Sequence, residues 1–196
     1  MTQASVKTNT PRLLSLIKAL GPEGRRTLNN GAAAGMSDLV QRHIYGLSGS
    51  RHATATRLQA LPTGHLAKAA RSVQHEADDK GGSVSIFSPG FARVFRDIRI
   101  APRVAQALTL PQHALSYGRR VSELRRIGIL IYRPKGTNIL ATNIDGKQVT
   151  LYALVKSVRL KQDRSLLPDD RTMERSASDA IFRTIKLIMQ KGAQTA

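Results

Sequence analysis

The chain of 196 residues lacks several residue types on which catalytic and binding sites often depend. It has no cysteine, which excludes disulfide bonds, thiolate zinc sites and cysteine nucleophiles. It has no tryptophan and only 4% aromatic residues, so its core must consist of leucine, isoleucine, valine and alanine. No apolar run approaches the roughly eighteen residues of a membrane-spanning helix, and the N-terminus lacks the apolar segment of a signal peptide. We therefore expect a soluble intracellular protein without contact to a membrane.

Acidic residues are scarce as well. The chain has 31 Lys and Arg against 13 Asp and Glu, a net charge of +18. The excess is spread along the sequence: residues 1–80 carry +6, residues 81–135 carry +8 and residues 136–196 carry +4. Basic side chains therefore belong to the folded elements and not to a disordered tail. Because such a charge opposes compaction, we expect a polyanion or an acidic protein surface as a neighbour.

The length of the chain predicts a single domain spanning residues 1–196. We divide it into an N-terminal helical region, a polar and basic loop or arm, and an α+β core, at residues 1–47, 48–62 and 63–196. In the helical region, Thr10 and Pro11 predict a short helix that ends near Gly21. A second predicted helix follows and continues to about residue 46.

Two glycines interrupt this second helix. Gly31 and Gly35 each weaken a helix by about 1 kcal/mol relative to alanine. Their stretch, NNGAAAG, indicates close contact with another backbone, either of this chain or of a neighbouring copy. A poor surface helix is the alternative.

The core is predicted to mix helices and strands. The helical spacing of apolar residues after Thr63 and Gly64 predicts a third helix that ends near residue 80. Residues rich in β-branched and apolar side chains predict three strands, at 83–87, 107–111 and 127–134. A short basic helical turn is expected between the last two of these strands. Residues 91–100 fit both a helical and a strand spacing, which leaves the two alternatives open.

The clearest local signal is Asp145-Gly146 between two β-rich runs. This dipeptide tolerates the positive φ angles of a tight turn and predicts a hairpin at residues 144–147. The second arm of the hairpin continues through residues 151–160, and we expect its first half inside a packed sheet. Together the strands predict a central, mainly antiparallel sheet.

The last predicted element is a C-terminal amphipathic helix that packs on this sheet. Pro168 stops the preceding strand, and either Asp169 or Asp170 caps the helix. An apolar stripe with helical spacing consists of Met173, Ala177, Ala180, Ile181, Ile185 and Ile188. The predicted fold is therefore α+β, with N-terminal helices, a central sheet and a C-terminal helix.

The motifs of common enzymes are missing from the sequence. It contains no P-loop, no dinucleotide-binding glycine motif and no nucleophile elbow. Residues 75–79 contain one His and three acids that suit a divalent cation, but a solvated helix end explains them as well. Asp169 and Asp170 resemble the acidic pair of a nuclease, yet a helix cap accounts for both. We expect no enzymatic activity, no metal and no cofactor.

Basic pairs are the better candidates for function. One group flanks a short helical turn and predicts a cationic ridge, and a second group follows the second arm of the hairpin, with Arg159 and Lys161 on one face. The candidates for contact with DNA or a partner are Arg119, Arg120, Arg125, Arg126, Lys156, Arg159, Lys161 and Arg164. Guanidinium and ammonium groups bind phosphate and carboxylate. Since no aromatic residues interleave them, we expect phosphate contact without reading of bases.

The order of these elements and two short motifs resemble the virion morphogenesis proteins of tailed phages, the Mu-like tail-completion or head-tail joining family. The first motif is a Thr-Gly-x-Leu helix start, matched by Thr63, Gly64 and Leu66. The second is a strand that leads into the last helix. It is matched by Leu154, Val155, Val158, Leu160, Arg164, Leu167 and Pro168.

The resemblance covers residues 25–190 in element order, with departures in the second motif. Gln162 and Ser165 stand where the family usually has prolines, and Leu166 stands where it has an aromatic residue. The resemblance implies a non-enzymatic structural protein of the virion, made in the host cytoplasm. It implies a homo-oligomeric ring, a hexamer or dodecamer, at the neck or tail end.

A ring of this kind has neck, portal-adaptor or tail-tube proteins as partners and surrounds duplex DNA. Lys and Arg at its lumen lower the repulsion between phosphates without reading sequence. The alternative function is a stand-alone basic nucleic-acid-binding protein without sequence specificity. A nuclease that uses Asp169 or Asp170 is the third hypothesis.

Overall fold

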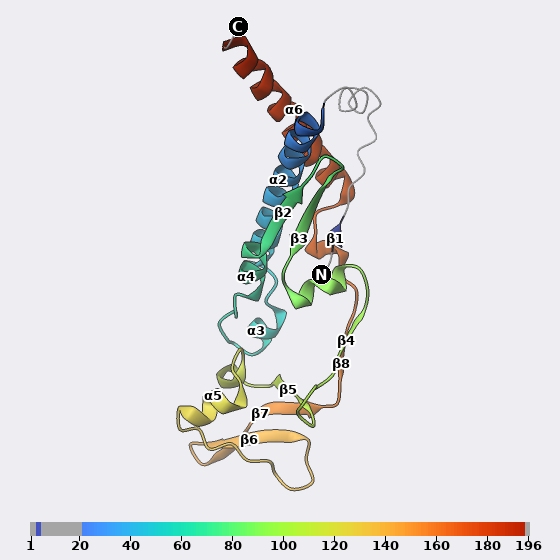
Figure 1. Ribbon diagram of the computed structural model, residues 1–196. Coiled ribbons are helices and arrows are strands. Elements are labelled where there is room, and N and C mark those ends of the chain that lie inside the picture. Colours follow the sequence, from blue (N-terminus) through green and yellow to red (C-terminus); the bar gives the residue numbers. More distant parts are fainter. Residues whose placement is uncertain (1–2, 5–20, 195–196) are drawn as a thin grey trace. The chain divides into compact units, whose positions relative to one another are not determined.

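The computed structural model describes residues 3–4 and 21–194 and has the predicted α+β class (Figure 1). The short helix predicted before Gly21 lies outside the described residues. The chain divides into two compact units. Unit 1 comprises residues 1–48, 65–95 and 163–196, and unit 2 comprises residues 49–64 and 96–162. That both belong to a single domain stays a prediction.

Two antiparallel helices form the frame of unit 1. They are α2 (Pro22–Leu47), which begins with proline at its first position, and α6 (Asp170–Gln194). Asp169 caps α6, since its Oδ1 accepts a hydrogen bond from the Thr172 amide at 2.9 Å. The prediction of one central sheet with α6 packed on it is wrong: the described strands form three small separate sheets, and the main partner of α6 is α2, where Ile181 packs against Leu28.

The glycines of α2 explain this pairing. A Cβ atom on Gly31 would collide with Thr184 Oγ1, and a Cβ atom on Gly35 would lie 2.5 Å from Ala180 Cβ. The Ser176 hydroxyl also donates a hydrogen bond to the Gly35 carbonyl at 3.0 Å. The predicted close contact with another backbone is thus confirmed, and that backbone belongs to α6 of the same chain.

A three-stranded antiparallel sheet of unit 1 has the order β1-β3-β2, with strands at Gln3–Ala4, Gly82–Ile86 and Val73–Ala77. The predicted strand at 83–87 is therefore confirmed as β3. The third predicted helix is wrong beyond Arg71, because α4 (His65–Arg71) ends there and β2 follows. The Ser72 amide and hydroxyl both donate to the Ala69 carbonyl and close the last turn. The Asp78 carboxylate then accepts from the amides of residues 80 and 81, which forms the β2–β3 turn.

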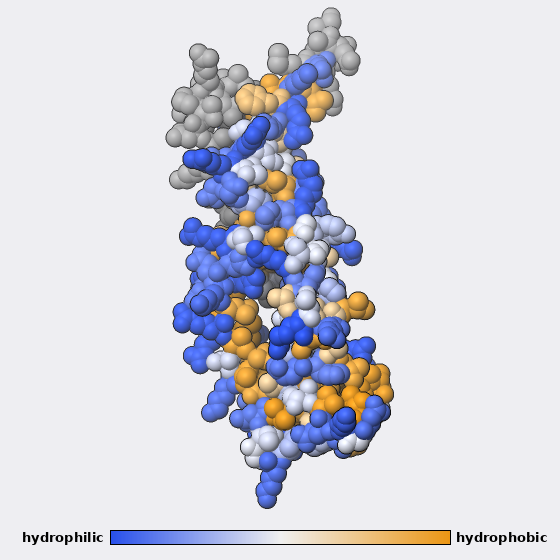
Figure 2. All heavy atoms as spheres, turned by 180° about the vertical axis from the view of Figure 1, so that it is seen from behind, coloured by the Kyte–Doolittle hydropathy of each residue, from blue (hydrophilic) through white to orange (hydrophobic). Residues whose placement is uncertain are grey.

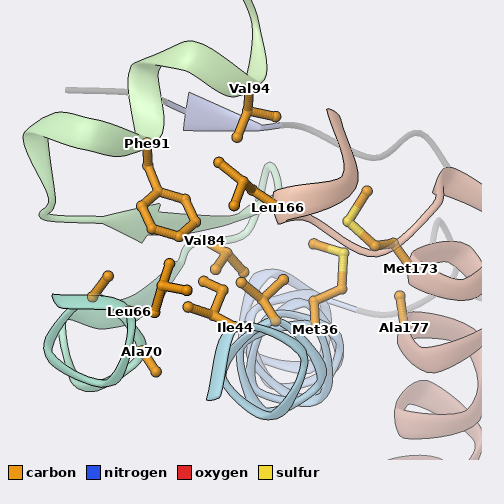
Figure 3. Close-up of a cluster of buried hydrophobic side chains, with 12 residues drawn as sticks. Met36, Ile44, Leu66, Ala70, Val84, Phe91, Val94, Leu166, Met173 and Ala177 are labelled. Carbon is orange, nitrogen blue, oxygen red and sulfur yellow. The ribbon is translucent and has the colours of Figure 1, made fainter. Parts of the chain in front are cut away.

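The core of unit 1 joins residues that lie far apart in the sequence (Figure 3). Buried side chains come from α2, α4, β3 and α6 and from two 3₁₀ helices, η1 (Pro89–Val94) and η3 (Arg164–Leu166). They are Met36, Val40, Ile44, Leu66, Ala69, Ala70, Val84, Phe91, Val94, Leu166, Met173 and Ala177. An ion pair of 3.1 Å between Arg93 and Asp163, and the Asp163 amide bonded to the Arg93 carbonyl, tie η1 to η3.

Unit 2 contains the predicted hairpin. Its strands are β6 (Ile139–Ile144) and β7 (Lys147–Val155), and Asp145 and Gly146 have the positive φ angles of 50° and 75° that the turn requires. β5 (Leu108–Pro111), also predicted, completes an antiparallel sheet with the order β5-β7-β6. α5 (Val121–Arg126), the expected basic turn, shares a core cluster with this sheet, consisting of Leu124, Ile131, Leu151 and Tyr152.

Two further predictions for unit 2 need correction. Residues 127–134 form no strand, because Gly128 has a φ of +88° and only Tyr132 bridges to β6, at Ala141. The predicted loop at 48–62 contains a short helix, α3 (Ala53–Arg57), in which Ala55 is buried.

The strand predicted at 151–160 is interrupted after β7. Its last part, β8 (Val158–Leu160), leaves the sheet of β7 and pairs antiparallel with β4 (Ile98–Ile100). The ambiguous residues 91–100 therefore contain both alternatives, the end of η1 and then β4. We call the pair β4–β8 the ribbon.

We predict opposite effects for alanine at two glycines of α2. Gly35→Ala should destabilise the protein, because overpacking costs about 1–3 kcal/mol and exceeds the helix-propensity gain of about 1 kcal/mol. Gly46→Ala is the control, since nothing lies within 4 Å of its Cβ position, and it should leave stability unchanged or raise it. Thermal unfolding of both variants measures the difference. Equal melting temperatures for Gly35→Ala and Gly46→Ala would contradict the close contact.

Candidate polyanion-binding surface

Positive charge is concentrated in unit 2. Its residues, 49–64 and 96–162, include 15 Lys and Arg but only 3 Asp and Glu, a net charge of +12. Unit 1 has 16 Lys and Arg and 10 Asp and Glu, a net charge of +6. Counts along the sequence hide this difference, because unit 2 is assembled from two separate segments. The structure thus points to unit 2 as the strongly cationic half of the chain.

The three acidic residues of unit 2 each take part in local structure. Asp97 Oδ2 lies 2.7 Å from Arg159 Nη2 in an ion pair. Glu123 Oε2 accepts a hydrogen bond from the Arg120 amide at 2.9 Å, at the start of α5. Asp145 occupies the hairpin turn. Most basic side chains of unit 2 therefore have no carboxylate within the unit to balance them.

The predicted cationic ridge lies around α5. Its four arginines, Arg119, Arg120, Arg125 and Arg126, are exposed. Two contacts hold the ridge on the sheet: Leu124 of α5 is fully buried, and the buried Tyr152 of β7 donates its hydroxyl to the Arg119 carbonyl at 3.0 Å. Burial is the main cause that raises the pKa of Tyr152, so this donor keeps its proton. The ridge is thus anchored through backbone and core contacts, and its guanidinium groups point to solvent.

The second predicted group is divided by the structure. Lys156 and Arg159 belong to β8 and its approach, and Lys161 directly follows β8; all three are exposed. Arg164 is exposed too but lies in η3, in unit 1. Seven of the eight candidate residues therefore belong to unit 2.

Sequence reasoning missed Arg99, which the fold places directly opposite Arg159. The register of the ribbon pairs Ile98 with Leu160, Arg99 with Arg159, and Ile100 with Val158. Because side chains alternate between the two faces of a strand, the arginines share one face and the four apolar residues share the other. No local signal reveals this pair, since 60 residues separate its members along the chain.

The acidic clusters of the sequence have structural roles. Asp78 closes the β2–β3 turn, and hydrogen bonds from the amides of Lys80 and Gly81 lower its pKa. Asp169 caps α6, and hydrogen bonds from the hydroxyl and amide of Thr172 lower its pKa. Within residues 3–4 and 21–194, no three His, Asp or Glu side chains are grouped to hold a metal ion. No described helix is long and apolar enough to cross a bilayer.

Comparisons of the chain with protein-family models, curated proteins and solved structures found no match.

The ion pair between Asp97 and Arg159 gives a prediction about pH. The Gln162 amide, which donates to Asp97 Oδ1 at 2.8 Å, is the main cause that lowers the pKa of Asp97 below 3.8, and the side chain of Arg159 is the second. The stabilisation from a lowered carboxyl pKa is complete above the unfolded value and disappears as the pH falls through the folded value. We therefore expect the ribbon to loosen only below about pH 3.8.

Titration of the Asp97 carboxyl carbon by NMR tests this assignment. In Arg159→Gln the pKa should rise but stay below 3.8, because the contact with the Gln162 amide persists. A wild-type pKa at or above 3.8 would contradict the described contacts.

Proposed function

We propose that the chain is a structural virion protein of a tailed phage, a ring-forming neck or tail-completion component that joins head and tail around the DNA channel. The observation that carries the proposal is the net charge of +12 on unit 2. A surface with this charge lowers the repulsion of closely spaced phosphates without reading bases. The motif resemblance at Thr63–Leu66 and around β8 supports the same function.

A second observation supports contact with other subunits. Unit 2 has a core cluster of four buried side chains, yet six of its large apolar side chains are exposed: Leu61, Ile100, Val104, Leu115, Ile127 and Leu130. Figure 2 shows orange apolar side chains gathered on unit 2, in the lower part of the view. Exposed apolar surface beside a small core is typical of subunits that bury it on assembly.

In this function the protein acts by position and charge, without catalysis or a cofactor. Its partners are further copies of itself in a hexameric or dodecameric ring, and the neighbouring neck, portal-adaptor or tail-tube proteins of the virion. Duplex DNA contacts it without sequence preference.

A stand-alone basic nucleic-acid-binding protein is the second candidate, because the charge of unit 2 supports it equally well. The two functions differ in assembly. A ring component forms a closed oligomer of defined mass, alone or with its virion partners, whereas the stand-alone protein binds DNA as a monomer or dimer.

We predict a closed oligomer of defined copy number for the purified chain, measured by native mass spectrometry and light scattering. Its binding to duplex DNA should be weak, independent of sequence, and lost as salt rises. Strong DNA binding by a monomer would favour the second candidate. A monomer that ignores DNA even at low ionic strength would overturn both.

A further inference from the structure

The ribbon brings two like charges together at a site that nothing in the local sequence indicates. Arg99 and Arg159 are register partners, so their Cβ atoms are about 5 Å apart on one face. Directly opposed like charges destabilise a strand pair. Both side chains are exposed, and no other described helix or strand packs closely against the ribbon. The ion pair between Asp97 and Arg159 offsets part of this cost, and Arg99 has no such carboxylate among the described residues. The pair is therefore positioned for an external anion.

Neighbouring polar groups orient the two guanidinium groups differently. Asp97 Oδ2 accepts hydrogen bonds from Arg159 Nε at 3.0 Å and from Nη2 at 2.7 Å. Arg99 Nε donates to Ser157 Oγ at 3.3 Å, and among the described residues no carboxylate pairs with Arg99. The Asp97 carboxylate repels an anion, but its oxygens are already bonded to Arg159 and to the Gln162 amide. Lys161 adds a further positive charge beside it.

We infer that Arg99 and Arg159 form a doublet that binds one phosphate group of a nucleic-acid backbone. Two adjacent guanidinium groups match the geometry of phosphate oxygens better than separate point charges do. The Ser157 hydroxyl is a further donor on the same side of the ribbon. This inference rests on the proposed function, since it names the residues through which the cationic unit 2 meets DNA.

A double-mutant cycle tests the doublet. Arg99→Gln and Arg159→Gln, singly and together, are compared for binding to a short random-sequence DNA duplex by fluorescence anisotropy over a series of salt concentrations. Each single variant should weaken binding about tenfold, and the double variant hardly more, because both arginines serve one phosphate. The salt slope of the double variant should fall by about 0.9, the value for one phosphate contact.

Arg57→Gln with Arg103→Gln is the matched control, since it removes the same charge from two exposed arginines of the same unit that do not face each other in a strand pair. The effects of the two control substitutions on DNA binding should be small and additive. Arg99→Lys separates geometry from charge: it keeps the charge but loses the planar fork, and should bind DNA about as weakly as Arg99→Gln. This variant also leaves the Asp97–Arg159 pair intact, so it stays informative if Arg159→Gln unfolds the ribbon.

Three results would overturn the doublet: additive effects of Arg99→Gln and Arg159→Gln, equal weakening in the control pair, or an equal loss of binding to poly-L-glutamate. The last result would assign the doublet to an acidic protein partner. The native mass of every variant is measured in parallel. An intact oligomer with unchanged DNA binding overturns the doublet alone, whereas a wild-type chain that neither assembles nor binds DNA overturns the proposed function with it.

Discussion

The contact between α2 and α6 is the interaction on which unit 1 depends. Gly31 and Gly35 remove the side chains that would hold the helices apart, and Thr184 and Ala180 occupy the space. This approach aligns Leu28 with Ile181 and lets Met36, Met173 and Ala177 enter one core together with β3 and the two 3₁₀ helices. The two glycines lower helix propensity, and the packing of two long helices offsets that cost.

Unit 2 is organised by a different constraint, a shortage of carboxylates. Its acids serve a helix start, a hairpin turn and one ion pair, so its many arginines and lysines repel each other across a small core. Binding of a polyanion or of further subunits relieves such repulsion and covers exposed apolar surface. Charge and core size therefore favour the same conclusion, that unit 2 meets other molecules.

Local signals predicted part of this structure. The Asp145-Gly146 turn and the capped, striped α6 depend on neighbouring residues, and both were confirmed. Residues 73–77 were predicted as helix because their alanine and valine fit that spacing, but pairing with β3 decided their conformation. The ridge arginines were found as adjacent pairs in the sequence. Arg99 was not, because its position opposite Arg159 depends on strand pairing between distant segments.

The hydrogen bond between the Asp163 amide and the Arg93 carbonyl has a consequence for how the chain can be rearranged. It joins two residues of unit 1, one just before and one just after residues 96–162. A short turn is therefore long enough to replace residues 96–162 and keep the chain continuous between the two parts of unit 1 that they separate. Residues 96–162 therefore have the topology of an insertion into unit 1, and together with residues 49–64 they make up unit 2.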